Sequence, residues 1–441
     1  MGTRLTRAAN DPRFLGWVNF WLLLILFIKL GGFFTWSNNI NITRVIKIFS
    51  RVLMTGGIIY LYRVLIDRGA VGAFRWQYSL SPLLYSAYLL LGLLSLLWST
   101  DPGYSGLQWF MDVEGFLFCY YFIACYVLLE HYFPGNTIRL SQTMGNAVML
   151  LIYIFLVGMY VNPDTFYRLT HGGEEARLGG FIMNPNELGM LCAVGVSCFI
   201  FNFYIRKQLF WTVLKIVLLM WAVTLTGSRS STIGCLLIMF FHINQSSNVK
   251  LKYAMYAGGL LVAPIAIEML VFKENAGGAD EVLNMTGRIP FWTALLTEGL
   301  PRAPFFGFGF MRIAETDYFQ GEHTLTYAAK MTHNTFIQVL MNLGFVGFTI
   351  VLAQMAALIM GLIKTKEKNK SLLVVGVMIP ILINSFTEFG IFGETNYGIL
   401  FYQLLIFYLS LTISTHLTPA ERLFLRHRRP DLVGGYADPH P

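Results

Sequence analysis

Charged residues are scarce in this chain. Only 13% of its 441 residues are Asp, Glu, Lys or Arg, whereas 55% are hydrophobic, and the mean hydropathy is +0.57. A water-soluble protein of this length needs a more polar surface, so the composition excludes an ordinary soluble enzyme and predicts a membrane protein. Apolar runs recur along nearly the whole length and leave no room for a separate soluble domain.

Several motifs of soluble chemistry are also missing. No P-loop, dinucleotide-binding glycine fingerprint or Gly-x-Ser-x-Gly elbow occurs in a suitable context. The five cysteines fall inside apolar runs without metal-ligand spacing, so neither a disulfide framework nor a zinc site is predicted. The first predicted external loop, residues 37–44, holds no carboxylate, and Glu315 and Asp317 form only a weak acidic pair. We therefore expect no metal and no other cofactor.

The apolar runs predict an all-α polytopic membrane protein with about twelve transmembrane helices. The second predicted span is interrupted by Lys47, Arg51 and Arg63, which could snorkel to the ends or mark an interfacial helix. The predicted spans are residues 14–35, 45–66, 80–98, 109–129, 142–161, 187–205, 208–226, 230–243, 253–272, 334–363, 371–388 and 397–415.

Basic residues gather in the predicted N-terminal segment, in alternate loops and in the C-terminal tail, so the positive-inside rule places both termini in the cytoplasm. Topology and lipid headgroups explain the net charge of +8, and no nucleic-acid partner is expected. The first apolar run is too long for a signal peptide, and we interpret it as a retained helix.

We expect one transmembrane domain, residues 14–415, between a cytoplasmic N-terminus, residues 1–13, and a cytoplasmic tail, residues 416–441. The domain includes one long hydrophilic loop, residues 273–332, between the ninth and tenth spans. The charge rule places this loop outside, and its sequence predicts partly helical structure after Gly287. A second external loop, about residues 162–186, contains Gly pairs and an Asn-Pro-Asn turn.

Arginines occur on an external face that should be short of them. Arg229 stands in Gly-Ser-Arg-Ser-Ser at the predicted start of the eighth span, where helix N–H groups and a guanidinium can bind an anion. The alternative is contact with lipid headgroup phosphates. Arg288 precedes a predicted helix in the long loop, where an arginine alone is ordinary but gains meaning beside Arg229. Arg168 and Arg177 lie in the second external loop.

A polar pair precedes the tenth span in the stretch MTHNTFIQVLMNLGFVG. His333 ionises near neutral pH and can accept a proton from a sugar hydroxyl. Asn334 can cap the helix or orient the histidine. The alternative is that both residues only satisfy backbone groups at the helix start. The sequence leaves cap and catalyst equally open at this point.

The helix count, the long external loop, the Gly-Ser-Arg-Ser-Ser stretch and the His333-Asn334 pair followed by Gly344 together resemble the bacterial O-antigen ligase and polymerase superfamily. The resemblance covers residues 14–415. It implies a glycosyltransferase of the inner membrane that moves O-antigen glycan from undecaprenyl pyrophosphate to the lipid A core oligosaccharide at the periplasmic face. Membrane lipids are the surrounding partners.

The resemblance also implies roles for individual residues. His333 would be the catalytic base, Arg288 would be both catalytic and pyrophosphate-binding, and Arg229 would bind the pyrophosphate. Arg177 and Arg168 are further candidates for the pyrophosphate, although their surroundings match no motif of the family. The reaction implied is independent of metal and nucleotide, and direct displacement would invert the anomeric centre.

Other functions are compatible with the sequence. O-antigen polymerases and protein O-oligosaccharyltransferases use the same chemistry and differ in acceptor. A lipid-linked glycan flippase or transporter also fits the helix count, but it should show paired repeats and charges along a path through the membrane. We find no convincing repeat, and the candidate residues gather at one face.

Overall fold

The computed structural model describes residues 11–413, apart from residues 69–73, 134, 171–174, 207–208, 246–248, 251, 254–255, 258–287, 313–331 and 389. The predicted ninth span, residues 253–272, lies almost wholly outside the described residues. The same is true of most of the long loop, residues 273–332, and of most of the predicted termini. Residues 288–312 and 332 are the described parts of that loop.

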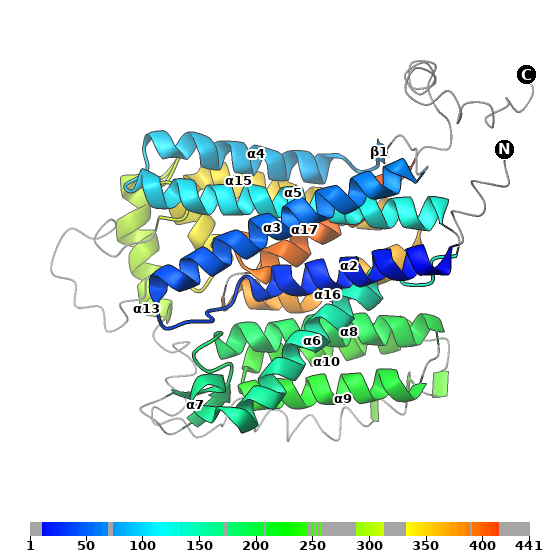
Figure 1. Ribbon diagram of the computed structural model, residues 1–441. Coiled ribbons are helices and arrows are strands. Elements are labelled where there is room, and N and C mark those ends of the chain that lie inside the picture. Colours follow the sequence, from blue (N-terminus) through cyan, green and yellow to red (C-terminus); the bar gives the residue numbers. More distant parts are fainter. Residues whose placement is uncertain are drawn as a thin grey trace, which may run out of the picture.

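The described chain is almost entirely helical, as predicted. Figure 1 shows the long helices lying side by side, with α13 and α7 at one end of the bundle and the start of α2 at the other. The long helices are α2 (Pro12–Gly31), α3 (Ile40–Asp67), α4 (Leu80–Leu94), α5 (Pro102–Tyr132), α6 (Leu140–Val161), α8 (Pro185–Arg206), α9 (Leu209–Thr226), α10 (Arg229–Gln245), α15 (Thr335–Lys364), α16 (Lys368–Ser385) and α17 (Tyr397–Ser410).

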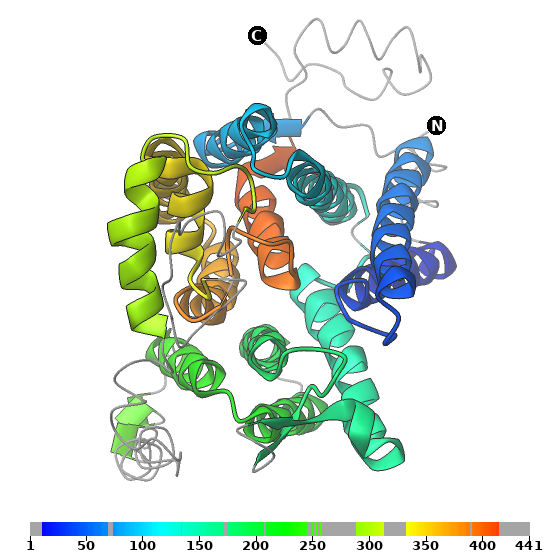
Figure 2. The same ribbon diagram turned by 90° about the vertical axis from the view of Figure 1, so that its left-hand side faces the viewer.

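Each predicted span other than the ninth coincides with one of these helices. Among the described residues, six helices are long and apolar enough to cross a membrane by length and composition, and these are α2, α3, α4 with its 3-10 extension, α5, α6 and α15. The shorter α17 packs against α5, α16 and α4, and all its residues except Tyr408 are buried. Figure 2 shows α17 surrounded by other helices when the bundle is viewed from one end. The number of twelve crossings stays a prediction.

Short elements complete the fold. A 3-10 turn, η1 (Ser95–Leu97), follows α4, and α7 (Pro163–Phe166) follows α6. Helix α13 (Arg288–Ala294) continues through a π-helical segment, Leu295–Gly299, into a 3-10 turn, Leu300–Arg302. Two antiparallel pairs were not predicted: β1 (Phe74–Trp76) with β4 (Leu411–Ile413), and β2 (Tyr167–Thr170) with β3 (Glu175–Leu178). Strands this short depend on their tertiary surroundings.

A break in α15 positions the Gly/Phe-rich part of the long loop. Gly344 has φ +62° and ψ −162°, which leaves the carbonyls of Met341 and Asn342 without their helical partners. The backbone N–H groups of Phe308 and Gly309 donate to these carbonyls at 3.0 and 2.9 Å. Non-helical backbone inside a membrane protein is tolerated where protein surrounds it in this way. The break therefore binds the Phe308–Gly309 part of the long loop to α15.

Buried charges join the first helices of the bundle. Lys29 of α2 and Thr55 of α3 both hydrogen-bond the Glu114 carboxylate of α5, and Arg51 of α3 lies 3.7 Å from the same carboxylate. Lys29 is fully buried and Arg51 is 4% exposed. Of the two interpretations offered for the cations of this span, snorkelling does not apply to Arg51, because a carboxylate on the neighbouring helix pairs with its charge inside the protein.

Candidate functional site

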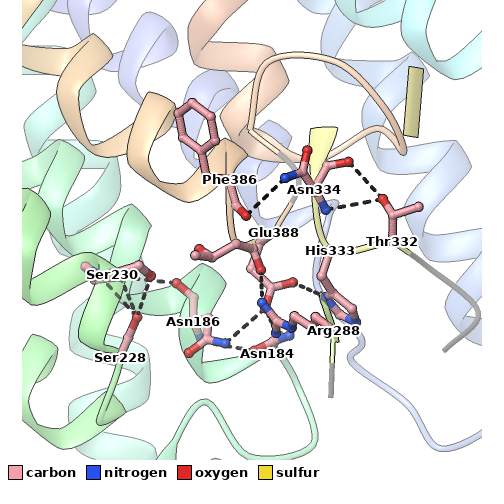
Figure 3. A network of polar contacts seen from close by, with 12 residues as sticks. Asn184, Asn186, Ser228, Ser230, Arg288, Thr332, His333, Asn334, Phe386 and Glu388 are labelled. Carbon is pink, nitrogen blue, oxygen red and sulfur yellow. Dashed lines mark hydrogen bonds and ion pairs between the residues drawn. The ribbon is translucent and has the colours of Figure 1, made fainter. Parts of the chain in front are cut away.

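The candidate site is built around Glu388, which lies in the segment between α16 and α17. The predicted eleventh span ran to residue 388, but α16 ends at Ser385 and Glu388 lies in the turn that follows. Its carboxylate is 3% exposed and accepts hydrogen bonds from His333 Nδ1 at 2.5 Å, Asn186 Nδ2 at 3.0 Å and Arg288 Nη2 at 3.2 Å. Figure 3 shows these side chains converging on Glu388 from three different segments.

Two opposing effects act on the pKa of the Glu388 carboxyl group. Burial disfavours its charged form, but the hydrogen bond and charge of His333, the charge of Arg288 and the hydrogen bond from Asn186 favour it. The net result is a pKa below the ordinary value of 4.5. Glu388 is therefore ionised at neutral pH and holds its partners by charge-assisted hydrogen bonds.

His333 has a left-handed backbone conformation. Its φ is +50°, in a region that residues other than glycine seldom adopt, although histidine, asparagine and aspartate adopt it more often than the rest. The following Asn334 caps α15, because its Oδ1 accepts from the N–H groups of Phe336 at 3.0 Å and Ile337 at 3.2 Å. Thr332 Oγ1 accepts from the Asn334 N–H at 3.2 Å. These contacts fix the backbone on the C-terminal side of His333.

Of the two roles considered for Asn334, the structure shows the cap of α15. Its Nδ2 also donates to the Phe386 carbonyl at 3.4 Å, two residues before Glu388. The side chain thus links the start of α15 to the segment that carries the partner of His333. Orientation of His333 by Asn334 stays a prediction.

Arg288 begins α13 and reaches the same segment. Its Nη1 donates to the Thr387 carbonyl at 2.5 Å, beside the ion pair with Glu388. The Nε atom is buried and has no hydrogen-bond partner in the described structure. A buried guanidinium nitrogen without an acceptor costs desolvation free energy, and an anion next to it would remove that cost.

Asn186 and Arg177 extend the network away from His333. Arg177 Nη2 donates to Asn186 Oδ1 at 2.8 Å, and its Nε donates to the Thr226 carbonyl at 2.7 Å. Asn186 lies in the first turn of α8, where its carbonyl also accepts from Ser231 Oγ at 3.3 Å. Strand β3 and the starts of α8 and α10 are thereby joined to Glu388.

Arg229 lies beside this network and not within it. It is the first residue of α10, is half-buried, and makes no side-chain hydrogen bond or ion pair with any described residue. Ser228, immediately before it, accepts from the Ser231 N–H at 3.3 Å and so caps the helix. Arg168 lies in β2 directly opposite Arg177 in the strand register.

The structure thus gathers His333, Arg288 and Asn186 around one carboxylate, with Asn334 bonded to the same segment at Phe386. Arg177 brings the turn before Arg229 close to this network. In the sequence, Glu388 is one of several ionisable residues predicted on the external face, and Asn186 is a candidate for a sugar site that turn chemistry explains equally well. The signal for Glu388 was an ionisable side chain at the end of an apolar span. Among the described residues, no group of three or more His, Cys, Asp and Glu could hold a metal ion. All five cysteines are buried and free.

The arrangement can perform proton transfer next to an anion. Because the ionised Glu388 can only accept, the hydrogen bond at Nδ1 is donated by His333, which places the ring lone pair on Nε2. A histidine oriented by a carboxylate is suited to act as a general base. Fold and site together define a polytopic membrane protein with a candidate acid–base centre at one end of its helix bundle.

Comparison with known protein families finds a match over part of the chain. Residues 214–352 match the sequence profile of the O-antigen ligase family. The matched segment includes Arg229, His333, Asn334 and Gly344, which carried the resemblance in the sequence, and also Arg288, whose role the resemblance implied. The match confirms that resemblance at the level of the O-antigen ligase superfamily. No curated protein sequence matches the chain.

Proposed function

We propose that this protein is an O-antigen ligase. In this proposal it transfers O-antigen glycan from undecaprenyl pyrophosphate to the lipid A core oligosaccharide at the periplasmic face of the bacterial inner membrane, with both termini in the cytoplasm. The observation that carries the proposal is the His333–Glu388 pair beside Arg288. His333 and Arg288 lie inside the segment that matches the family, and Glu388 contacts both.

In the proposed reaction, His333 Nε2 removes the proton from an acceptor sugar hydroxyl. The hydroxyl oxygen forms a bond to the anomeric carbon of the donor while the bond from that carbon to the pyrophosphate oxygen breaks. Attack from the face opposite the leaving group inverts the anomeric centre. Glu388 stabilises the imidazolium that forms, as an oriented carboxylate does for a catalytic histidine.

The departing lipid pyrophosphate gains negative charge and needs cationic partners. Arg288 is fixed by Thr387 and Glu388 and keeps a buried Nε without an acceptor, while Arg229 stands at a helix N-terminus without a side-chain partner among the described residues. Both are suited to this role. Arg177 is held by Asn186 and Thr226, and we assign it and Arg168 to the wall of the pyrophosphate site.

Reconstitution tests the proposal. Purified protein in vesicles, supplied with undecaprenyl-pyrophosphate-linked O-antigen and a lipid A core acceptor, should form glycosylated lipid A core at the same rate with and without chelator. Loss of transfer on chelation would contradict metal independence. Transfer to a second lipid-linked glycan or to a protein would favour the polymerase or the protein O-oligosaccharyltransferase. Movement of donor across the membrane without covalent transfer would favour a flippase.

A further inference from the structure

A second polar site lies at the same end of the bundle and takes no part in the His333 network. A cavity of about 740 Å³ opens between the first half of α3, the start of α5 and the segment between α16 and α17. Figure 1 shows that α3 begins at the end of the bundle where α13 lies. The volume falls in the range of small-molecule sites and exceeds what one ion needs.

The charges that line this cavity are mostly positive. Arg44, Lys47 and Arg51 line it from α3, and Glu394 is its one lining carboxylate. Neither Arg44 nor Lys47 makes a side-chain hydrogen bond or ion pair with a described residue. Burial raises the pKa of Glu394, against the opposing charge of Lys47. The site is therefore suited to an anion.

Arg51 gives a second and independent indication of an anionic ligand. Its side chain is 5% exposed, one Nη donates to the Met111 carbonyl at 3.0 Å, and the guanidinium lies 3.7 Å from Glu114. Its Nε is buried without a hydrogen-bond partner. The guanidinium that lines the cavity therefore keeps unused hydrogen-bonding capacity, which favours an anion beside it.

A different face of α3 from the one that lines the cavity is apolar and exposed. Val45, Phe49 and Leu53 follow one another at helical spacing and are 66%, 65% and 53% exposed. In a membrane protein such a row contacts hydrocarbon chains. A ligand with an anionic headgroup and hydrocarbon chains would match both the cavity and this helix face.

We propose that the cavity binds the phosphorylated sugar headgroup of the acceptor glycolipid, with its acyl chains along the outer face of α3. This inference rests on the proposed function, which requires two membrane-anchored substrates. The donor pyrophosphate must leave from the carbon attacked next to His333 and Arg288. Glu388 faces those residues, whereas Glu394 of the same segment faces the cavity. The second anionic lipid therefore has its own site on the other side of that segment.

Kinetics with each substrate varied separately test the assignment. The double variant Arg44→Gln/Lys47→Gln should raise KM for the lipid A core acceptor about tenfold or more, because hydrogen bonds to charged groups are lost. The kcat and the donor KM should stay near wild type. Arg63→Gln is the matched control, since Arg63 is an exposed cation on the same helix that does not line the cavity. Arg51 is left intact because it also pairs with Glu114.

A binding measurement examines the cavity without relying on transfer. Detergent-purified protein is incubated with phosphorylated lipid A or with the same lipid after phosphatase treatment, and retention is measured by native mass spectrometry. The wild type should bind the phosphorylated lipid about tenfold more tightly, and the double variant should lose this preference.

The two measurements separate the possible failures. Equal retention of the two lipids by the wild type would overturn the inference, as would a rise in donor KM with the acceptor KM unchanged. A wild-type protein that transfers no glycan yet prefers the phosphorylated lipid would contradict the proposed function and support a phosphorylated-lipid site in the cavity.

Discussion

His333 Nδ1 lies 2.5 Å from Glu388 Oε2, and this contact joins the start of α15 to the turn after α16. The two residues are 55 positions apart in the sequence. The contact sets the ring orientation of the histidine, and the same carboxylate pairs with Arg288. One buried charge thus organises the proposed base and one of the proposed pyrophosphate ligands.

Replacing His333 with asparagine tests the base with little change in the backbone. Asparagine tolerates the positive φ of this position, so His333→Asn should fold, whereas a β-branched residue would add strain. We expect kcat for glycan transfer to fall by about 10²–10⁴. His131→Asn, in the exposed last turn of α5, should transfer at the wild-type rate. A well-folded His333→Asn protein with wild-type activity would exclude His333 as the base.

The lowered pKa of Glu388 predicts a dependence of stability on pH. A carboxyl group whose pKa is lower in the folded state contributes stability above its unfolded value near 4.5, and this contribution is lost as pH falls through the lower folded pKa. The Tm in detergent should therefore drop below about pH 4.5 by more in wild type than in Glu388→Gln. Identical Tm–pH curves for the two proteins would show that Glu388 is not ionised as proposed.

Replacing Arg288 with lysine separates charge from geometry. A lysine keeps the positive charge but cannot bond the Thr387 carbonyl and Glu388 at once through a planar fork. Arg288→Lys should lower kcat/KM by about tenfold or more, and Arg288→Ala by about 10²–10³. The exposed Arg302→Lys serves as control. Full activity of Arg288→Lys would mean that charge alone suffices.

Two substitutions of Asn334 test its role as a cap. Serine caps helices about as well as asparagine, so Asn334→Ser should keep wild-type stability, whereas Asn334→Ala should cost about 0.5–2 kcal/mol. Because Nδ2 of Asn334 also holds the Phe386 carbonyl, the serine variant should still lose some activity. Thermal unfolding and transfer rates measured on the same samples check both parts. Equal Tm values for the two variants would contradict the cap.

Replacing Gly344 with alanine tests whether the break in α15 requires a glycine. A Cβ atom at this position would lie 2.3 Å from the Phe305 carbonyl carbon, and φ is +62°. Gly344→Ala should therefore detach the Pro304–Gly309 stretch from α15 and lower the Tm by several degrees. Gly56→Ala is the matched control, since a Cβ on Gly56 in α3 meets nothing within 4 Å. Similar Tm values for the two variants would show that the break does not need glycine.

The apolar periodicity of the sequence determined most of the helices, because a chain in lipid must satisfy its backbone polar groups within each segment. The local sequence predicted a helix just after Arg288 and left open whether Asn334 caps α15, and the structure shows α13 beginning at Arg288 and Asn334 capping α15. The short strand pairs and the break at Gly344 were not predicted, since both depend on segments that are distant in sequence.

The candidate site also has features that the sequence predicted and features that only the tertiary structure shows. The sequence by itself made His333 and Arg288 candidates, because ionisable groups at the membrane boundary are costly and few, and it left their roles open. Only the tertiary structure decided that Glu388 joins them, that Arg177 is held by Asn186, and that Arg44 and Lys47 line a cavity with the buried Arg51. Charges pair according to which helix ends lie next to each other in space. The sequence of a single span does not specify which other helices it packs against.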